Sequence, residues 1–378
     1  MLDRIIQQRR QDAESRILRN YRERFQSFAM LVPSARYGIY GAAKALLRAG
    51  DRVIISPITC RSVIRALLAA GVHPVFADIE LDTGNIDPAR LPNALSASTT
   101  AIVTTNLYGN PDSIVELRSV ARSRGLLLIE DCAHAMHTTV DGKPVGCFGD
   151  IALFSFKKYF NQSGGVVTVR DPSAAAAVAR LARTEIVSPP EHEERARYLQ
   201  YVVEKEASHA VAAALSAVYR LLRDAGSRVP RAGEPLPAPQ NHEEQAPFSR
   251  ILPTTAVLLR VGEMLARIGE IVAERKAAAQ ALIAECPLPL KRSRLSRDVC
   301  YLAVPFGTTR RDKIVATMQA RGIPTYFLYS PPMNELFGVP HDDYKPDEGL
   351  VREWCRTILP INPRFGPQYL ECIGASAA

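Results

Sequence analysis

Residues with the means to do chemistry gather in two neighbouring stretches, EDCAH (130–134) and FSFKKYFNQSGG (154–165). In the first, Asp131 follows an apolar run that we expect to form a buried strand, where a lone carboxylate is costly. Such a carboxylate needs a bound cation, an arginine partner or a helix that it caps. In the second, Lys157 and Lys158 carry amines that can bond to a carbonyl carbon and shuttle a proton. The plain alternative for both lysines is a solvated pair at the mouth of a loop.

Alternating strand and helix patterns surround these residues from 50 to 170, which is typical of a mainly parallel sheet with helices on both faces. The predicted strands are 52–56, 74–78, 101–105 and 126–130, and helices are predicted at 60–71 and 112–125. Ligands of such α/β sheets bind at the carboxyl ends of the strands. We therefore expect the site beside Asp131 and the segment VTTNLYG (103–109).

A change of character after residue 173 predicts two domains. Residues 1–245 form the large domain, with a helical excursion at about 173–227 and a proline-rich linker at 228–247. Residues 246–378 form a smaller C-terminal α/β domain that begins with a long helix, 253–285.

The helical excursion carries an apolar stripe at helical spacing. Its members are Val211, Leu215, Val218 and Leu222. The stripe predicts an amphipathic helix that packs on the body of the protein or on a partner chain. In the smaller domain, the sequence predicts a strand in 298–306, a helix at 312–322 and an extended segment at 323–329.

The composition excludes several classes of protein. The 378-residue chain is 47% hydrophobic and 23% charged, without an apolar run of membrane-spanning length or the apolar core of a signal peptide. We expect a cytoplasmic protein with no membrane partner. The net charge is +8, but the arginines are scattered, which favours a basic surface or an anionic small substrate over nucleic acid. The seven cysteines lack CxxC pairs or metal-ligand spacing with histidine, so we expect reduced thiols and no metal site.

Several segments, taken in order, are similar to those of a known family. They are GDRVIISPITCRSVIRALLAAGVHPVFADIELDTGNIDP, TTNLYGNP, LLLIEDCAHA, GKPVGCFGDIALFSF, YSPPMNELFG and LPINP. The chain resembles the DegT/DnrJ/EryC1/StrS sugar aminotransferases over roughly residues 25–370, apart from a helical stretch near 185–245. The resemblance implies pyridoxal-phosphate (PLP) fold type I, like aspartate aminotransferase. It also implies a homodimer, PLP or its amine form as cofactor, and a keto sugar, nucleotide-linked, or a related carbonyl compound as substrate, with glutamate as amino donor.

The resemblance assigns cofactor contacts to individual residues. Asp131 would pair with the pyridine nitrogen, and His134, at the family's glutamine position, would contact the ring hydroxyl. Ser155 and Ser34 would bind the phosphate, and Arg36 could pair with it directly. The remaining predicted cofactor contacts are Ala35, Cys60, Asn161 and Arg250.

Four positions depart from the family pattern. Ala35 replaces a glycine at the phosphate site, and Cys60 replaces an aromatic that stacks on the ring, a role for which Tyr37 or Tyr108 could substitute. Phe248 replaces an asparagine that the partner subunit contributes to the phosphate site, although Arg250 is kept. The fourth departure, Phe160, concerns the catalytic lysine.

The family's Schiff-base lysine has no unambiguous counterpart. Counting five residues from Ser155 gives Phe160, whereas counting seven back from Gly164 gives Lys157, because this connection is shorter than the family's. If the strand continued, Lys157 would share a face with Ser155 and Lys158 would point away. The sequence favours Lys157 over Lys158, and the absence of any Schiff-base lysine stays open.

Without that lysine, ordinary transamination would be crippled. One alternative is a dehydratase-like enzyme that uses the cofactor's amine form, with His134 or His137 as base. Another is a catalytically inactive homologue that acts as a binding or scaffolding partner through its helical excursion.

Overall fold

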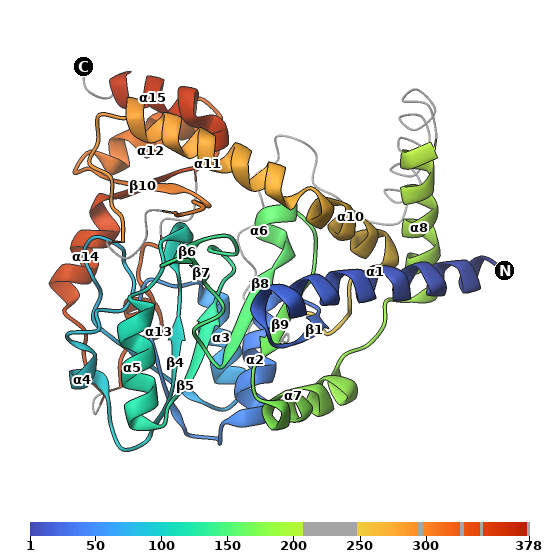
Figure 1. Cartoon of the computed structure of the whole chain (residues 1–378). Coiled ribbons are helices and arrows are strands. Elements are labelled where there is room, and N and C mark those ends of the chain that lie inside the picture. Colours follow the sequence, from blue (N-terminus) through green and yellow to red (C-terminus); the bar gives the residue numbers. More distant parts are fainter. Residues whose placement is uncertain (207–247, 294–297, 326–328, 341–342, 376–378) are drawn as a thin grey trace.

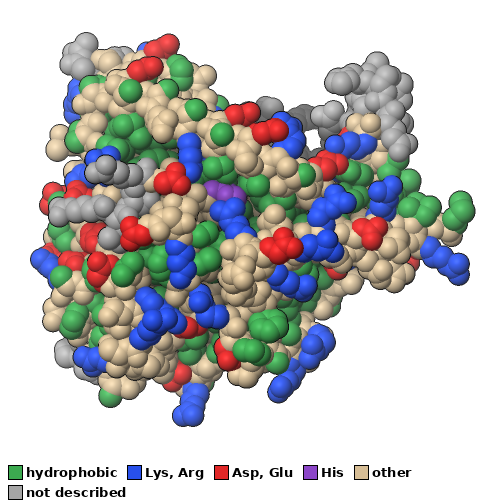
Figure 2. All heavy atoms as spheres, in the orientation of Figure 1, with side chains coloured by type: hydrophobic (Ala, Val, Ile, Leu, Met, Phe, Trp, Pro, Cys, Tyr) green, Lys and Arg blue, Asp and Glu red, His purple; other side chains and the backbone are tan. Residues whose placement is uncertain are grey.

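The computed structural model describes residues 1–206, 248–293, 298–325, 329–340 and 343–375 (Figure 1). The stripe at 211–222 and the linker at 228–247 lie outside these residues. None of the described helices combines the length and the apolar character needed to cross a bilayer. On the face shown in Figure 2, Lys and Arg side chains are interspersed with Asp and Glu.

A seven-stranded sheet forms the centre of the large unit, in the order β1-β9-β8-β5-β4-β2-β3. Neighbours pair in parallel from β3 to β8, whereas β9 runs antiparallel to both β8 and β1. The mainly parallel α/β sheet expected from the sequence is therefore present. Its strands are β1 (Phe28–Val32), β2 (Arg52–Ile55), β3 (His73–Phe76), β4 (Thr99–Thr104), β5 (Leu127–Asp131), β8 (Ile151–Ser155) and β9 (Gly165–Val169).

Helices cover both faces of the sheet because successive strand residues point to opposite sides. Ile54, Ile102 and Leu128 face one core with buried residues of α1, α5 and α10, whereas their neighbours Val53 and Val103 face a second core with α2 and α3. The helices are α1 (Leu2–Phe25), α2 (Ala35–Leu46), α3 (Arg61–Ala69), α5 (Ile114–Arg124), α7 (Pro172–Glu185), α8 (Glu191–Glu206) and α10 (Thr255–Ala266). Shorter elements are α4 (Leu91–Ala94), β6 (Thr139–Val140), β7 (Lys143–Pro144) and α6 (Phe156–Phe160).

The C-terminal part has a hydrophobic core of its own, which extends in sequence from Ala279 to Ile373. A two-stranded antiparallel sheet lies within it, formed by β10 (Val304–Gly307) and β11 (Ile358–Ile361). Its helices are α11 (Ile268–Glu285), α12 (Arg311–Ala320), α13 (Met333–Phe337), α14 (Glu348–Thr357) and α15 (Gly366–Ala375).

The predicted long helix 253–285 is in fact two helices. Arg267 separates α10 from α11 with φ −107° and ψ 16°, outside the helical region. The two halves bury their apolar residues in different cores: Leu258 lies in the core against the sheet, and Leu282 lies in the C-terminal core. The domain boundary at 245/246 stays a prediction, and α10, which follows it, packs with the large unit.

At Gly165, the first residue of β9, the backbone of this strand lies very close to the backbone of neighbouring segments. A Cβ there would lie against the carbonyl oxygen of Phe154 and 3.2 Å from the backbone nitrogen of Ala35. Gly165→Ala should therefore lower the free energy of unfolding by about 1–3 kcal/mol through overpacking. The measurement is chemical denaturation.

Gly262→Ala is the matched control, since a Cβ at this position of α10 would meet no atom within 4 Å. Alanine is the better helix former, so this variant should be as stable as the wild type or more stable. Equal stability of both variants would contradict the close approach at Gly165.

Candidate functional site

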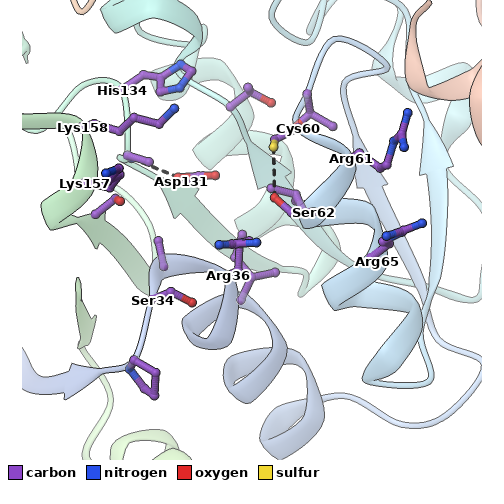
Figure 3. Close-up of a pocket in the computed structure, with 18 of the residues that line it drawn as sticks. Ser34, Arg36, Cys60, Arg61, Ser62, Arg65, Asp131, His134, Lys157 and Lys158 are labelled. Atoms are coloured by element: carbon purple, nitrogen blue, oxygen red, sulfur yellow. Dashed lines mark hydrogen bonds between the residues drawn. The ribbon is translucent and has the colours of Figure 1, made fainter. Parts of the chain in front are cut away.

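A cavity of about 730 Å³ opens at the carboxyl ends of β4, β5 and β8, beside the N-termini of α2 and α3 (Figure 3). This is the edge of the sheet at which the sequence predicts a site, and the volume is ordinary for a small-molecule pocket. The cavity brings together most of the predicted site residues. They are Ser34, Ala35, Arg36, Cys60, Asp131, His134, Ser155, Lys157 and Lys158.

Asp131 is the last residue of β5, and its carboxylate accepts a hydrogen bond from the N–H of Ala133 at 2.9 Å. Burial raises the pKa of Asp131 to about 6, against the opposing effects of that hydrogen bond and of the Lys158 charge. The carboxylate is thus poorly compensated where it faces the cavity. A cationic group of a bound molecule would compensate it.

His134 has a defined tautomer. Its Nδ1 lies 3.2 Å from the backbone N–H of Tyr108, from which it accepts a hydrogen bond. Burial lowers the pKa of His134 well below its usual range, and the positive charge of Lys158 acts in the same direction. The ring is therefore neutral and carries its proton on Nε2, so that it can donate a hydrogen bond to a ligand in the cavity.

The two lysines lie in different environments because β8 ends at Ser155 and a short helix, α6, follows. The strand alternation on which the preference for Lys157 rested therefore does not reach that residue. Lys157 is exposed, and its Nζ donates to Oδ1 of Asn161 at 2.9 Å. Lys158 is half-buried, and burial lowers the pKa of its amine to about 8.

Electrostatic effects on the Lys158 amine oppose one another. Arg36 and Lys157 lower its pKa further, whereas Cys60 and Asp131 raise it. In Figure 3 the Lys158 side chain extends toward His134, on the same side of the cavity as Asp131. The Lys158 amine is therefore readily deprotonated beside the buried carboxylate.

The wall formed by the start of α2 is suited to an anion. Ser34 caps this helix, because its Oγ accepts the N–H of Tyr37 at 3.2 Å. Its hydroxyl hydrogen remains available to a ligand, as do N–H groups in the first turn of the helix. Gly164, with φ +100°, and Ser155 form the adjoining wall.

Thr105 supplies an orphaned polar atom. The side chain is 6% exposed and lines the cavity, and its Oγ1 has no hydrogen-bond partner among the described residues. Buried hydroxyls are nearly always hydrogen-bonded, so this oxygen is another point at which a ligand would bind. Together with Asp131 and the α2 wall, it gives the cavity the donors and acceptors that a phosphorylated pyridine needs.

Two predicted cofactor contacts lie outside the described lining of the cavity. Asn161 ends α6 and holds the amine of Lys157. Arg250 is exposed, with its Nη2 3.8 Å from Oε1 of Glu185. The cofactor contacts assigned to these two residues stay predictions.

The departures from the family pattern are explained in part by packing. Phe160 is 1% exposed and belongs to the core beneath α6. Phe248 packs on Tyr40, with ring centroids 4.7 Å apart. Among the described lining residues, neither Tyr37 nor Tyr108 is present to replace the aromatic missing at Cys60. His137, suggested as a base, is buried near Tyr159 and also lies outside the lining.

The sequence analysis did not predict several of the residues that line the cavity. They are Pro33, Ile39, Thr59, Arg61, Ser62, Val63, Arg65, Thr105, Ala133, Ser163, Gly164, Ser249 and Tyr329. Arg61 and Arg65 could have been predicted from the sequence. They lie four residues apart, on one face of a predicted helix that begins just after a predicted strand. The helix α6 could also have been predicted, because its buried residues Phe156, Tyr159 and Phe160 have i, i+3, i+4 spacing.

Residues 18–204 match the sequence model of the DegT/DnrJ/EryC1/StrS aminotransferase family. Over this region, which is just under half of the chain, the sequence is similar to that family. It is 36% identical over 151 residues to the spore coat polysaccharide biosynthesis protein SpsC of Bacillus subtilis (strain 168), covering 39% of each chain. It is 32% identical over 165 residues to the GDP-perosamine synthase of Escherichia coli O157:H7, covering 40% of this chain and 45% of the relative. The matches thus span about two fifths of these relatives.

The fold extends further than the sequence match. The solved structure of the aminotransferase TlmJ from Streptoalloteichus hindustanus superposes with a TM-score of 0.71 at 19% identity, over 98% of this chain and 90% of that one. The chain therefore has the fold type I architecture expected from the sequence.

The buried carboxylate gives a test that requires no activity. Without cofactor, ionised Asp131 destabilises the folded state, because its folded pKa lies above the usual value of 3.8. Asp131→Asn keeps a hydrogen-bond acceptor for Ala133 and should raise the free energy of unfolding at pH 8 by roughly 1–3 kcal/mol. The gain should shrink as the pH falls below 6 and should vanish below about 3.8, where the carboxyl is protonated in both states. Denaturation curves across this range provide the measurement.

Asp150→Asn is the control, since Asp150 is paired with Arg118 at 2.7 Å and accepts the N–H of Leu128 at 2.9 Å. This variant should be less stable than the wild type at pH 8. A destabilised Asp131→Asn protein at pH 8 would contradict the poor compensation of Asp131.

Proposed function

We propose that this protein is a PLP-dependent aminotransferase that acts on the carbonyl carbon of a keto sugar, in its nucleotide-linked form, with Lys158 as the lysine that bonds to the cofactor. The observation that carries the proposal is the half-buried Lys158 amine, with its pKa lowered to about 8, in the same cavity as the buried carboxylate of Asp131. The family match and the perosamine synthase among the relatives support the reaction and the substrate class.

When bound, PLP supplies an aldehyde that takes up an amino group and a protonated ring that withdraws electrons from the reacting carbon. Asp131 would hold the ring nitrogen protonated, since a buried carboxylate favours a cation beside it. His134 would donate from Nε2 to the ring oxygen. Ser34, Ser155 and the first turn of α2 would bind the phosphate.

Lys158 would act as nucleophile and then as proton carrier. At pH 8 about half of an amine with a pKa near 8 is neutral. A neutral amine can attack a carbonyl carbon and can accept a proton from the substrate carbon, which an ordinary exposed lysine does poorly at this pH. The Lys157 charge is held at Asn161 and contributes to the cavity as a fixed cation.

Borohydride reduction of PLP-loaded protein identifies the linked residue. We expect the wild type to be yellow and to yield a pyridoxyl group on Lys158 in peptide mass spectrometry. Lys158→Ala should lose the label and the colour, while the matched variant Lys157→Ala keeps both.

A label on Lys157 would contradict the proposed role of Lys158. PLP uptake without a reducible link would favour dehydratase-like chemistry with the amine form of the cofactor. A protein that takes up no PLP would favour the inactive, scaffolding homologue.

We also propose that the protein is a homodimer in the cytoplasm, with the site at the interface between subunits. Exposed apolar side chains near the cavity support this, because Val187 and Ile251 are 52% and 43% exposed, and Ile251 lies two residues from the lining residue Ser249. Light scattering during gel filtration should give about twice the monomer mass of 41.5 kDa. A monomer with undiminished PLP binding would refute the dimer.

A further inference from the structure

We propose that Arg61 and Arg65, together with Arg36, form a second anion subsite in this cavity that binds a phosphate or diphosphate group of the substrate. The inference rests on the proposed function for the identity of the substrate, but the subsite itself is argued from the charges and positions of this chain's residues.

The three arginines come from two helices that begin at the cavity. Arg61 is the first residue of α3 and Arg65 follows one turn later on the same face, while Arg36 lies in the first turn of α2. All three line the cavity. In Figure 3, Arg61 and Arg65 lie on the side away from Lys157, Lys158 and His134, and Arg36 lies between the two groups.

None of these three guanidinium groups has an ion pair or a hydrogen bond within the described parts of the chain. Other arginines do have such partners: Arg118 pairs with Asp150 at 2.7 Å, and Arg352 with Glu335 at 2.7 Å. Three unpaired arginines around one cavity repel one another. All three residues are exposed, and a ligand that brings negative charge to the cavity would relieve this repulsion.

The charges of the lining residues indicate how much negative charge such a ligand would carry. Five cationic side chains and one carboxylate, Asp131, line the cavity as described. The cations are Arg36, Arg61, Arg65, Lys157 and Lys158. A cofactor phosphate carries a charge of about −2 at neutral pH and would be held at the α2 wall. A positive excess then remains, and it is concentrated on α3.

The start of α3 adds donors to the guanidinium groups. Its cap residue, Cys60, makes no side-chain capping bond to the helix, so the N–H groups of Arg61 and Ser62 lack that partner. The hydroxyl of Ser62, whose Oγ lies 3.0 Å from Sγ of Cys60, lies beside them. Planar guanidinium forks together with N–H donors match the several oxygens of a phosphate group. A diphosphate offers oxygens to both Arg61 and Arg65 at once.

Inorganic pyrophosphate is the probe, titrated calorimetrically into PLP-loaded protein. We expect binding to weaken roughly tenfold to a hundredfold in the Arg61→Gln/Arg65→Gln variant, as is typical for the loss of charge-assisted hydrogen bonds. The matched control is Arg122→Gln/Arg124→Gln, which removes the same charge from the exposed end of α5, outside the cavity lining. Its pyrophosphate affinity should equal that of the wild type, and PLP uptake should be equal in all three proteins.

Unchanged pyrophosphate affinity in the Arg61/Arg65 variant would overturn the subsite. So would loss of PLP uptake in that variant alone, because the arginines would then belong to the cofactor site. Succinate that binds as tightly as pyrophosphate, with the same dependence on Arg61 and Arg65, would assign the pair to a carboxylate and overturn the phosphate. If the wild type takes up no PLP, the proposed function fails, but the two double variants still test the subsite with pyrophosphate.

Discussion

The central constraint on this molecule is a carboxylate with too little compensation at the end of a buried strand. The sheet places Asp131 where β5 meets the cavity, and one backbone N–H and a half-buried lysine are the groups that offset its charge. Burial acts on both members of this pair, raising the pKa of Asp131 and lowering that of Lys158. Each group is thus kept in a form that a charged aromatic ligand can use.

Positively charged side chains line the rest of the cavity around the Asp131 carboxylate. His134 is held neutral by burial and by its hydrogen bond from Tyr108, so it adds a donor without adding charge. The helices α2 and α3 begin where the neighbouring strands end. The arginines in their first turns make the far side of the cavity strongly basic. A cation-binding carboxylate and an anion-binding wall in one cavity suit a ligand with charges of both signs.

The order of elements was predictable because the apolar runs from 52 to 130 and the helical patterns between them are long and regular. Asp131 was predictable because it ends an apolar run, and Ser34 and Ser155 were predictable from the family resemblance. The position of the lysine was not, because it depends on where β8 stops, and the apolar run IALFSF continues one residue past the last strand residue, Ser155. The break at Arg267 was hidden for a related reason: both halves have good helical sequences, and only their packing on two different cores separates them.

The short helix α6 also bears on how this connection could change in length. Each helical residue advances the side-chain direction by about 100°, so one residue inserted between Ser155 and Lys158 would swing the amine out of the cavity. Residues 161–163 follow the helix, so they do not affect the direction of the Lys158 side chain. A change in the length of the connection after Lys158 would leave the direction of its amine unchanged, whereas a change before it would not.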